Sequence, residues 1–175
     1  MRDILFETPI WHLECTDKSI VKELKEWAIK YEREHKSINI TNRGGYHGPN
    51  ETEIKKLPCI DYFKERLSFL PNCHVDNWWL NVQRKDNYNV EHCHGGAALS
   101  LIWYITDNNN TLVFRNENEY ARHGLWHMFD YPLARNWNAK AGDIVMFPSD
   151  VPHRVEPHTG NTPRMSIALN ISPRG

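Results

Sequence analysis

The 175-residue sequence has almost no net charge, no long apolar run and few cysteines. Its 21 Lys and Arg residues nearly balance its 22 Asp and Glu residues, so a strong electrostatic attraction to nucleic acid or to an acidic membrane is not expected. No apolar run approaches the roughly 20 residues that a membrane-spanning helix needs. Met1-Arg2-Asp3 lacks the basic and then apolar pattern of a secretory signal. These absences predict a soluble, cytoplasmic protein.

The four cysteines are far apart and form no Cys-x-x-Cys pair; they are Cys15, Cys59, Cys73 and Cys93. A disulfide framework is therefore not expected, and a reducing intracellular setting fits this pattern better. The length corresponds most simply to one domain, residues 1–175, with enough chain to form a hydrophobic core.

The first 75 residues are predicted to contain a strand and two packing helices. Residues 4–13 alternate loosely between apolar and polar side chains, as in a short strand. Apolar side chains recur at helical spacing over residues 18–36 and again over residues 58–70. Residues 37–50 are rich in Gly and Asn and are predicted to form a loop.

From residue 76 the pattern changes to short strands separated by turns. The predicted strands cover residues 76–84, 97–105, 111–115, 144–147, 153–155 and about 163–171. Residues 116–138 show no clean period and are expected to form a long loop. Helices followed by seven or eight short strands are typical of an antiparallel sandwich or jelly roll, so the predicted fold class is mainly β with N-terminal packing helices.

A Glu-His-Cys-His sequence at residues 91–94 places two imidazoles at the end of a strand-like run. If the chain is extended there, His92 and His94 point to the same side, because side chains alternate between faces. Two neutral imidazoles on one face can bind one transition metal. His153 follows a proline-rich corner and can supply a third ligand, whereas alternation directs Glu91 away from His92.

Arg164 and Ser166 share one face of the last predicted strand. A guanidinium group binds a carboxylate through two parallel hydrogen bonds, and a hydroxyl two residues further on can add a third. Burying an arginine inside a jelly roll without an anion is costly, so this pair predicts an anionic ligand. Asn81, on the first predicted strand of the series, is a candidate for a further polar contact in the same pocket.

Five motifs in chain order resemble the 2-oxoglutarate- and Fe(II)-dependent oxygenases, most closely the small prolyl-hydroxylase-like group of bacteria and phages. The resemblance covers about residues 76–171 and rests on His92-x-His94, Ser100–Ile105, Gly142–Ser149, His153-Arg154-Val155 and Arg164-x-Ser166. It implies a double-stranded β-helix, Fe(II) at the three histidines, and an Arg–Ser pair that holds the distal carboxylate of 2-oxoglutarate. It also implies a dioxygenase, and more specifically a hydroxylase, that couples decarboxylation of 2-oxoglutarate to oxidation of a substrate C–H bond.

Position 94 departs from the common pattern of this superfamily, which is His-x-Asp or His-x-Glu. A three-His site has one negative charge less, so we expect it to hold Fe(II) less tightly and to shift its potential. Related enzymes often use a tyrosine to help hold 2-oxoglutarate, and here Trp103 or Tyr104 occupies the corresponding strand.

Two other classes of function fit the histidines. One is a cupin-type dioxygenase with three His ligands and no 2-oxoglutarate, and the other is a non-catalytic jelly-roll module that binds Zn or Ni. Neither needs an Arg-x-Ser pair on the last strand, so Arg164 discriminates against both.

Other histidines and loops are assigned lesser roles. His123 and His127 are expected on the surface or in a lid, and His47 is a weaker candidate for the mouth of the site. The segments 40–50 and 116–138 are candidates for a substrate lid. The primary substrate is not specified by the sequence, although a peptide or a small molecule is favoured.

Overall fold

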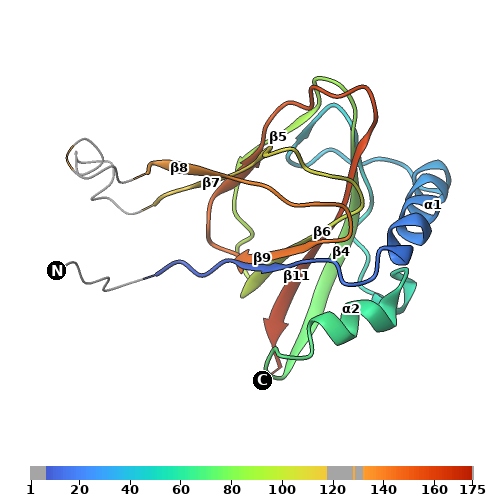
Figure 1. The fold of residues 1–175 in the computed structure, drawn as a ribbon, viewed down its shortest axis with the longest axis horizontal. Helices are drawn as coiled ribbons and strands as arrows, with labels where there is room; N and C mark the ends of the chain where they lie inside the picture. The colour runs from blue at the N-terminus through green and yellow to red at the C-terminus, as the bar shows by residue number, and fades with distance from the viewer. Residues whose placement is uncertain (1–6, 118–127, 129–131, 175) are drawn as a thin grey trace.

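The computed structural model describes residues 7–117, 128 and 132–174. Two antiparallel sheets form the body of the molecule, and both α-helices lie outside the larger sheet (Figure 1). The helical elements are α1 (Ser19–Glu34), the 3-10 helix η1 (Ile54–Lys56) and α2 (Ile60–Arg66). The strands are β1 (Trp11–Leu13), β2 (Asn42–Arg43), β3 (Tyr46–His47), β4 (Cys73–Gln83), β5 (Tyr88–His92), β6 (Leu99–Tyr104), β7 (Leu112–Arg115), β8 (Ala134–Trp137), β9 (Ile144–Pro148), β10 (His153–Val155) and β11 (Arg164–Pro173).

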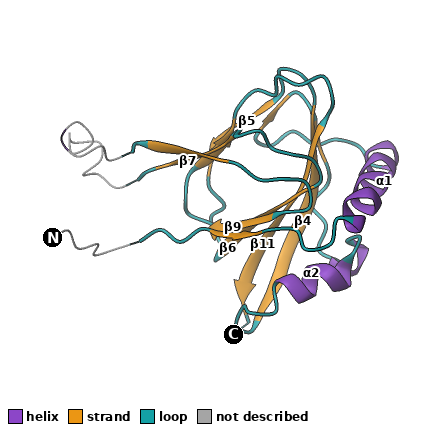
Figure 2. Cartoon of the chain, in the orientation of Figure 1, coloured by secondary structure: helices purple, strands orange, loops and turns teal. Residues whose placement is uncertain are grey.

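The strand order confirms the predicted jelly roll. The six-stranded sheet has the order β1-β9-β6-β11-β4-β3, and the five-stranded sheet has the order β2-β5-β10-β7-β8. From β4 onward the chain passes from one sheet to the other at each step except between β7 and β8, which pair with each other. Figure 2 shows the two sheets as two groups of arrows, with the helices on one side only. The chain is mainly β, as its sequence predicted.

The main hydrophobic core lies between the large sheet and the helices. Along β4, alternate residues Trp78, Leu80 and Val82 face this core and are fully buried. On α1, Leu24 and Ala28 are fully buried against them, because residues four apart lie on the same helix face. A second, smaller cluster fills part of the space between the sheets; it contains Tyr104, Leu112, Phe114, Ala139, Val145 and Phe147.

The other face of the large sheet is unusually polar for a sheet interior. The residues that alternate with the core positions of β4 and β11 point between the two sheets. They include Asn77, Asn81, Gln83, Arg164, Ser166 and Asn170. Buried polar side chains need partners, so this inner face is the natural place for a bound polar ligand.

Several predicted boundaries are corrected by the structure. The helix expected over residues 58–70 is confined to α2, because Cys59 adopts a left-handed conformation with φ 47° and the regular helix ends at Arg66. The segment 37–50, expected as a loop, contributes β2 and β3, one to each sheet. Gly45 between them has φ +71°, and an added Cβ would lie 2.9 Å from the carbonyl oxygen of Val82.

The segment 116–138 includes β8 and is therefore not entirely a loop. Residues 118–127 and 129–131 of the expected lid, with His123 and His127, lie outside the described residues. No helix in the described part of the chain is long and apolar enough to cross a membrane.

Asp143 ties the N-terminal strand to the corner before β9. Its carboxylate accepts hydrogen bonds from the Cys15 N–H at 2.8 Å, from His12 Nε2 at 3.0 Å and from the Lys140 N–H at 2.9 Å. Burial by itself raises the pKa of Asp143, but these hydrogen bonds outweigh it and the pKa is lowered. The ionised carboxylate therefore stabilises the attachment of β1 to β9.

Candidate metal centre and co-substrate cavity

Three histidines converge at one end of the jelly roll. His92 ends β5 and pairs in register with His153, the first residue of β10. His94 lies just beyond β5, where its backbone N–H donates to the Ser149 carbonyl at 2.9 Å. One nitrogen from each imidazole can be chosen so that all three lie within 4.8 Å of one another. Among the described residues this is the one group of three or more His, Cys, Asp or Glu side chains with such geometry.

Hydrogen bonds fix the orientation of all three rings. His92 Nδ1 and His153 Nδ1 each donate to the backbone carbonyl two residues earlier, at 2.8 and 2.9 Å. His94 Nδ1 lies 2.7 Å from Asn170 Oδ1. A carbonyl oxygen only accepts, so Nδ1 carries the proton in each ring and Nε2 keeps its lone pair. Three ring nitrogens are thereby available to one metal ion.

The environment keeps the imidazoles neutral. Burial lowers the pKa of His92, and burial together with the nearby His92 lowers the pKa of His94. Burial and the His92 ring lower the pKa of His153 to about 3. Neutral imidazole is the form that binds a metal, so protons compete weakly for these nitrogens at neutral pH.

The same cavity extends from the histidines to Arg164. Seventeen residues line it, including the three histidines, Arg164, Ser166 and Asn81, and none of them is an Asp or a Glu. Arg164 is only 4% exposed, and burial lowers its pKa to about 10, so it remains a cation at neutral pH. Its Nη1 is buried without a hydrogen-bond partner. An unpaired cation in a cavity without carboxylates fits an anionic ligand.

Gln83 orients the guanidinium group. Its Oε1 accepts hydrogen bonds from Arg164 Nε, at 2.9 Å, and from Arg164 Nη2. Arg164 Nη2 also donates to the Glu156 carbonyl at 3.1 Å. The Gln83 side chain is itself held, because its Nε2 donates to Asn89 Oδ1. Among the guanidinium nitrogens of Arg164, which lines the cavity, only Nη1 is left without a partner.

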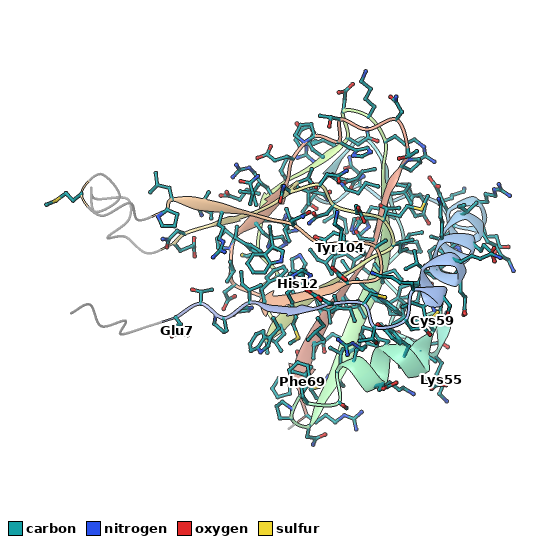
Figure 3. All side chains as sticks on the ribbon, viewed as in Figure 1. Glu7, His12, Lys55, Cys59, Phe69 and Tyr104 are labelled. Carbon is teal, nitrogen blue, oxygen red and sulfur yellow. The ribbon has the colours of Figure 1, made fainter. Side chains whose placement is uncertain are left out.

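Tyr104, rather than Trp103, faces the cavity. Tyr104 pairs in register with Ser166 and lines the cavity with it, and Figure 3 labels its side chain between the two sheets. Burial raises the pKa of Tyr104 to about 12, against the opposing effects of Asn108 and Arg164, so the phenol stays protonated. Trp103 points to the helix side, where its Nε1 donates to the Gly142 carbonyl at 3.2 Å.

Glu91 and His47, which were not predicted as metal ligands, do not lie in the metal cluster. Glu91 forms ion pairs with Arg115 at 3.0 Å and with Arg154 at 3.6 Å, away from the cavity. His47 is buried and stacks on Trp79, which in turn packs against the ring of His94. His47 therefore lies behind the metal cluster and does not line the cavity.

Two polar residues of the site were missed by sequence reasoning: Gln83, which holds Arg164, and Asn170, which holds His94. Both are on the inner face of β4 or β11. The alternation that placed Arg164 and Ser166 on one face extends to Asn170, and this signal was available in the sequence.

Comparisons with known proteins agree with this geometry. The sequence profile of the family described as "Putative 2OG-Fe(II) oxygenase" matches residues 77–170, which is more than half of the chain. The chain therefore belongs to this family and is an Fe(II)- and 2-oxoglutarate-dependent oxygenase. No curated protein sequence matches the chain significantly.

Solved structures share the fold at low sequence identity. The epimerase SnoN from nogalamycin biosynthesis, a non-heme alpha ketoglutarate dependent enzyme, is 14% identical with a TM-score of 0.70, over 95% of this chain and 78% of that one. HygX from Streptomyces hygroscopicus, solved with nickel and 2-oxoglutarate bound, is 10% identical with a TM-score of 0.64, over 95% and 83%. A prolyl-4-hydroxylase from Pseudomonas putida is 13% identical with a TM-score of 0.64, over 96% and 94%. These similarities establish the jelly-roll fold.

Proposed function

We propose that His92, His94 and His153 bind Fe(II), and that Arg164 and Ser166 bind the distal carboxylate of 2-oxoglutarate. One observation carries this proposal: a single cavity is lined by the three histidines and by a buried arginine whose Nη1 has no partner. A 2-oxo acid with a second carboxylate has the matching chemistry, because its oxo acid end can chelate a metal while its distal carboxylate meets the guanidinium. Asn81 is proposed as an additional polar contact for the same molecule.

Each residue has a distinct task in this scheme. Bound Fe(II) and 2-oxoglutarate supply the oxidising chemistry, in which O2 and a substrate C–H bond are converted to an alcohol while 2-oxoglutarate yields succinate and CO2. The imidazoles, fixed by their Nδ1 hydrogen bonds, present Nε2 in one constant geometry. Arg164, held by Gln83, orients the co-substrate, and Tyr104 and Ser166 present hydroxyl groups to the same cavity.

A three-His dioxygenase that uses no 2-oxoglutarate is the less favoured alternative. Such an enzyme does not need a buried arginine in the metal cavity, and Arg164 would then carry an uncompensated charge. A non-catalytic metal-binding module is disfavoured for the same reason.

The primary substrate is proposed to be a peptide or a small molecule. A second cavity of about 610 Å³ lies beside His153. Its wall includes Phe114, which pairs with His153 across the sheet, and Pro152, which precedes His153 in the chain. Its lining combines these apolar groups with both Arg135 and Asp150. Succinate release in the presence of peptide and metabolite mixtures should exceed the release without them, whereas oligonucleotides should give no increase.

The metal assignment is tested by anaerobic addition of Fe(II) and 2-oxoglutarate. We expect a weak visible charge-transfer band in the native protein and no band in His153→Ala. His74→Ala is a matched control, because His74 is an exposed histidine that pairs with Asp76 outside the cavity. Absence of the band in the native protein, or its persistence in His153→Ala, would contradict the proposal.

A further inference from the structure

His94 is oriented by side chains, whereas its two partners are oriented by backbone. Its Nδ1 lies 2.7 Å from Asn170 Oδ1 and 2.9 Å from Ser100 Oγ. Ser100 Oγ is also 2.9 Å from Ser149 Oγ. On the far side, Asn170 Nδ2 donates to Asn77 Oδ1 at 2.9 Å. The ring is thus the end of a hydrogen-bonded chain of polar side chains from β4, β6, β11 and the corner after β9.

The direction of this chain is determined by Asn170. Its amide nitrogen is engaged with Asn77, so its carbonyl oxygen faces His94 and can only accept. His94 must therefore donate from Nδ1 and keep the lone pair on Nε2. Because His94 lies beyond the end of β5, no strand pairing holds its ring, in contrast to His92 and His153, which pair with each other.

We propose that Asn170 is a positioning residue for the metal, acting through His94, and that Asn77 and Ser100 hold it in that role. This inference rests on the proposed function of the three histidines. It gives a physical account of the unusual ligand at position 94: a histidine needs an acceptor for its second ring nitrogen, and the amide of Asn170 supplies it. An acceptor hydrogen-bonded to a metal-binding histidine typically contributes about 10–100-fold to metal affinity.

The test compares Asn170→Ala with Asn170→Asp in the intact chain, with Zn(II) as the probe. Asn170→Ala removes the carbonyl acceptor and leaves only the Ser100 hydroxyl beside Nδ1, so Zn(II) should bind about 10–100-fold more weakly than to the native protein. Asn170→Asp keeps an acceptor oxygen and makes it a carboxylate, so Zn(II) should bind as tightly as in the native protein or more tightly. Asn42→Ala is the control, because Asn42 is a buried asparagine whose side chain bonds only backbone groups of its own loop.

Nuclear magnetic resonance of the imidazole N–H groups in the Zn(II) protein supplies a readout that a general loss of stability would not produce. In Asn170→Asp, one of the three slowly exchanging ring N–H signals should move downfield, because its hydrogen bond becomes charge-assisted, while the other two stay in place. In Asn170→Ala, that one signal should move upfield and exchange faster with solvent, because the Ser100 hydroxyl is the only acceptor left beside Nδ1. If Asn170→Ala does not fold, the Asn170→Asp spectrum decides alone.

The outcomes separate this inference from the function on which it rests. If the native protein binds Zn(II) but neither variant changes the affinity or the ring N–H signals, Asn170 has no positioning role. An equal loss of affinity in Asn42→Ala would also overturn it. If the native protein binds no divalent metal, or binds it equally well after replacement of His153, the proposed metal site itself is wrong.

Discussion

Replacement of Arg164 by methionine tests the proposed carboxylate anchor. Methionine fills a similar volume and has no charge, so the main change is the loss of one buried cation from the cavity. In the native structure Arg164 is 4% exposed, with Nη1 unpartnered and no acidic residue in the cavity lining. The site is therefore expected to acquire its counter-charge only when the dicarboxylate binds.

The expected magnitude follows from the burial of this group. Truncating one partner of a buried, hydrogen-bonded charge pair costs about 2–5 kcal/mol. The Kd for 2-oxoglutarate should therefore increase by a factor between about 30 and several thousand. The metal should bind unchanged, because Arg164 forms no hydrogen bond with the three histidines. Stability without ligand should change little, since the lost desolvation penalty of the cation opposes the loss of donors to Gln83.

The assay is anaerobic calorimetry of 2-oxoglutarate binding to the Fe(II)-loaded protein, accompanied by thermal unfolding. At about 100 times the native Kd, the co-substrate should stabilise the native protein by about 2.7 kcal/mol and Arg164→Met by about 0.9 kcal/mol or less. Arg66→Met is the control, because Arg66 is on α2 and donates to the Glu14 carbonyl outside the cavity. Native-like 2-oxoglutarate affinity in Arg164→Met would refute the assignment of the anchor.

Three further predictions address neighbouring features. Replacement of His94 by Asp should leave metal binding intact and tighten it, because a carboxylate adds the negative charge that three imidazoles lack; weaker binding in a metal titration would count against a ligand at this position. Gln83→Leu should weaken the binding free energy of 2-oxoglutarate by about 1–3 kcal/mol, since Arg164 loses its side-chain acceptor, while calorimetry should show unchanged metal affinity. Asp143→Asn should destabilise the fold by about 1–3 kcal/mol at pH 7. Because the folded-state pKa of Asp143 is lowered, its contribution is present above the unfolded pKa of about 3.9 and is lost as the pH falls through the folded value, so urea unfolding should show the difference shrinking in acid.

The order of motifs in the sequence was enough to predict the fold class. It was also enough to place the histidines and the Arg164–Ser166 pair in one site. His92 and His153 are 61 positions apart, but they pair in register because each occupies the metal end of its strand, as the jelly-roll resemblance implied. Arg164 and Ser166 share a face through alternation alone, and both line the cavity.

Features that depend on the register between strands could not be predicted from the sequence. Whether Trp103 or Tyr104 faces inward is decided by the pairing of Tyr104 with Ser166, and nothing local to that strand distinguishes the two aromatic residues. The contact of His94 with Asn170 likewise joins residues 76 positions apart. The strands β2 and β3 were predicted as loop because their Gly- and Asn-rich sequence has weak strand propensity, which sheet pairing overrides.

The most direct test of the metal centre is X-ray absorption spectroscopy of the protein loaded anaerobically with Fe(II). The structure predicts one iron per chain, with multiple scattering from three imidazole rings contributed by His92, His94 and His153. His94→Asp should lower that number to two. A native spectrum with two or fewer imidazoles, or an unchanged spectrum in the His94 variant, would contradict a three-histidine iron site.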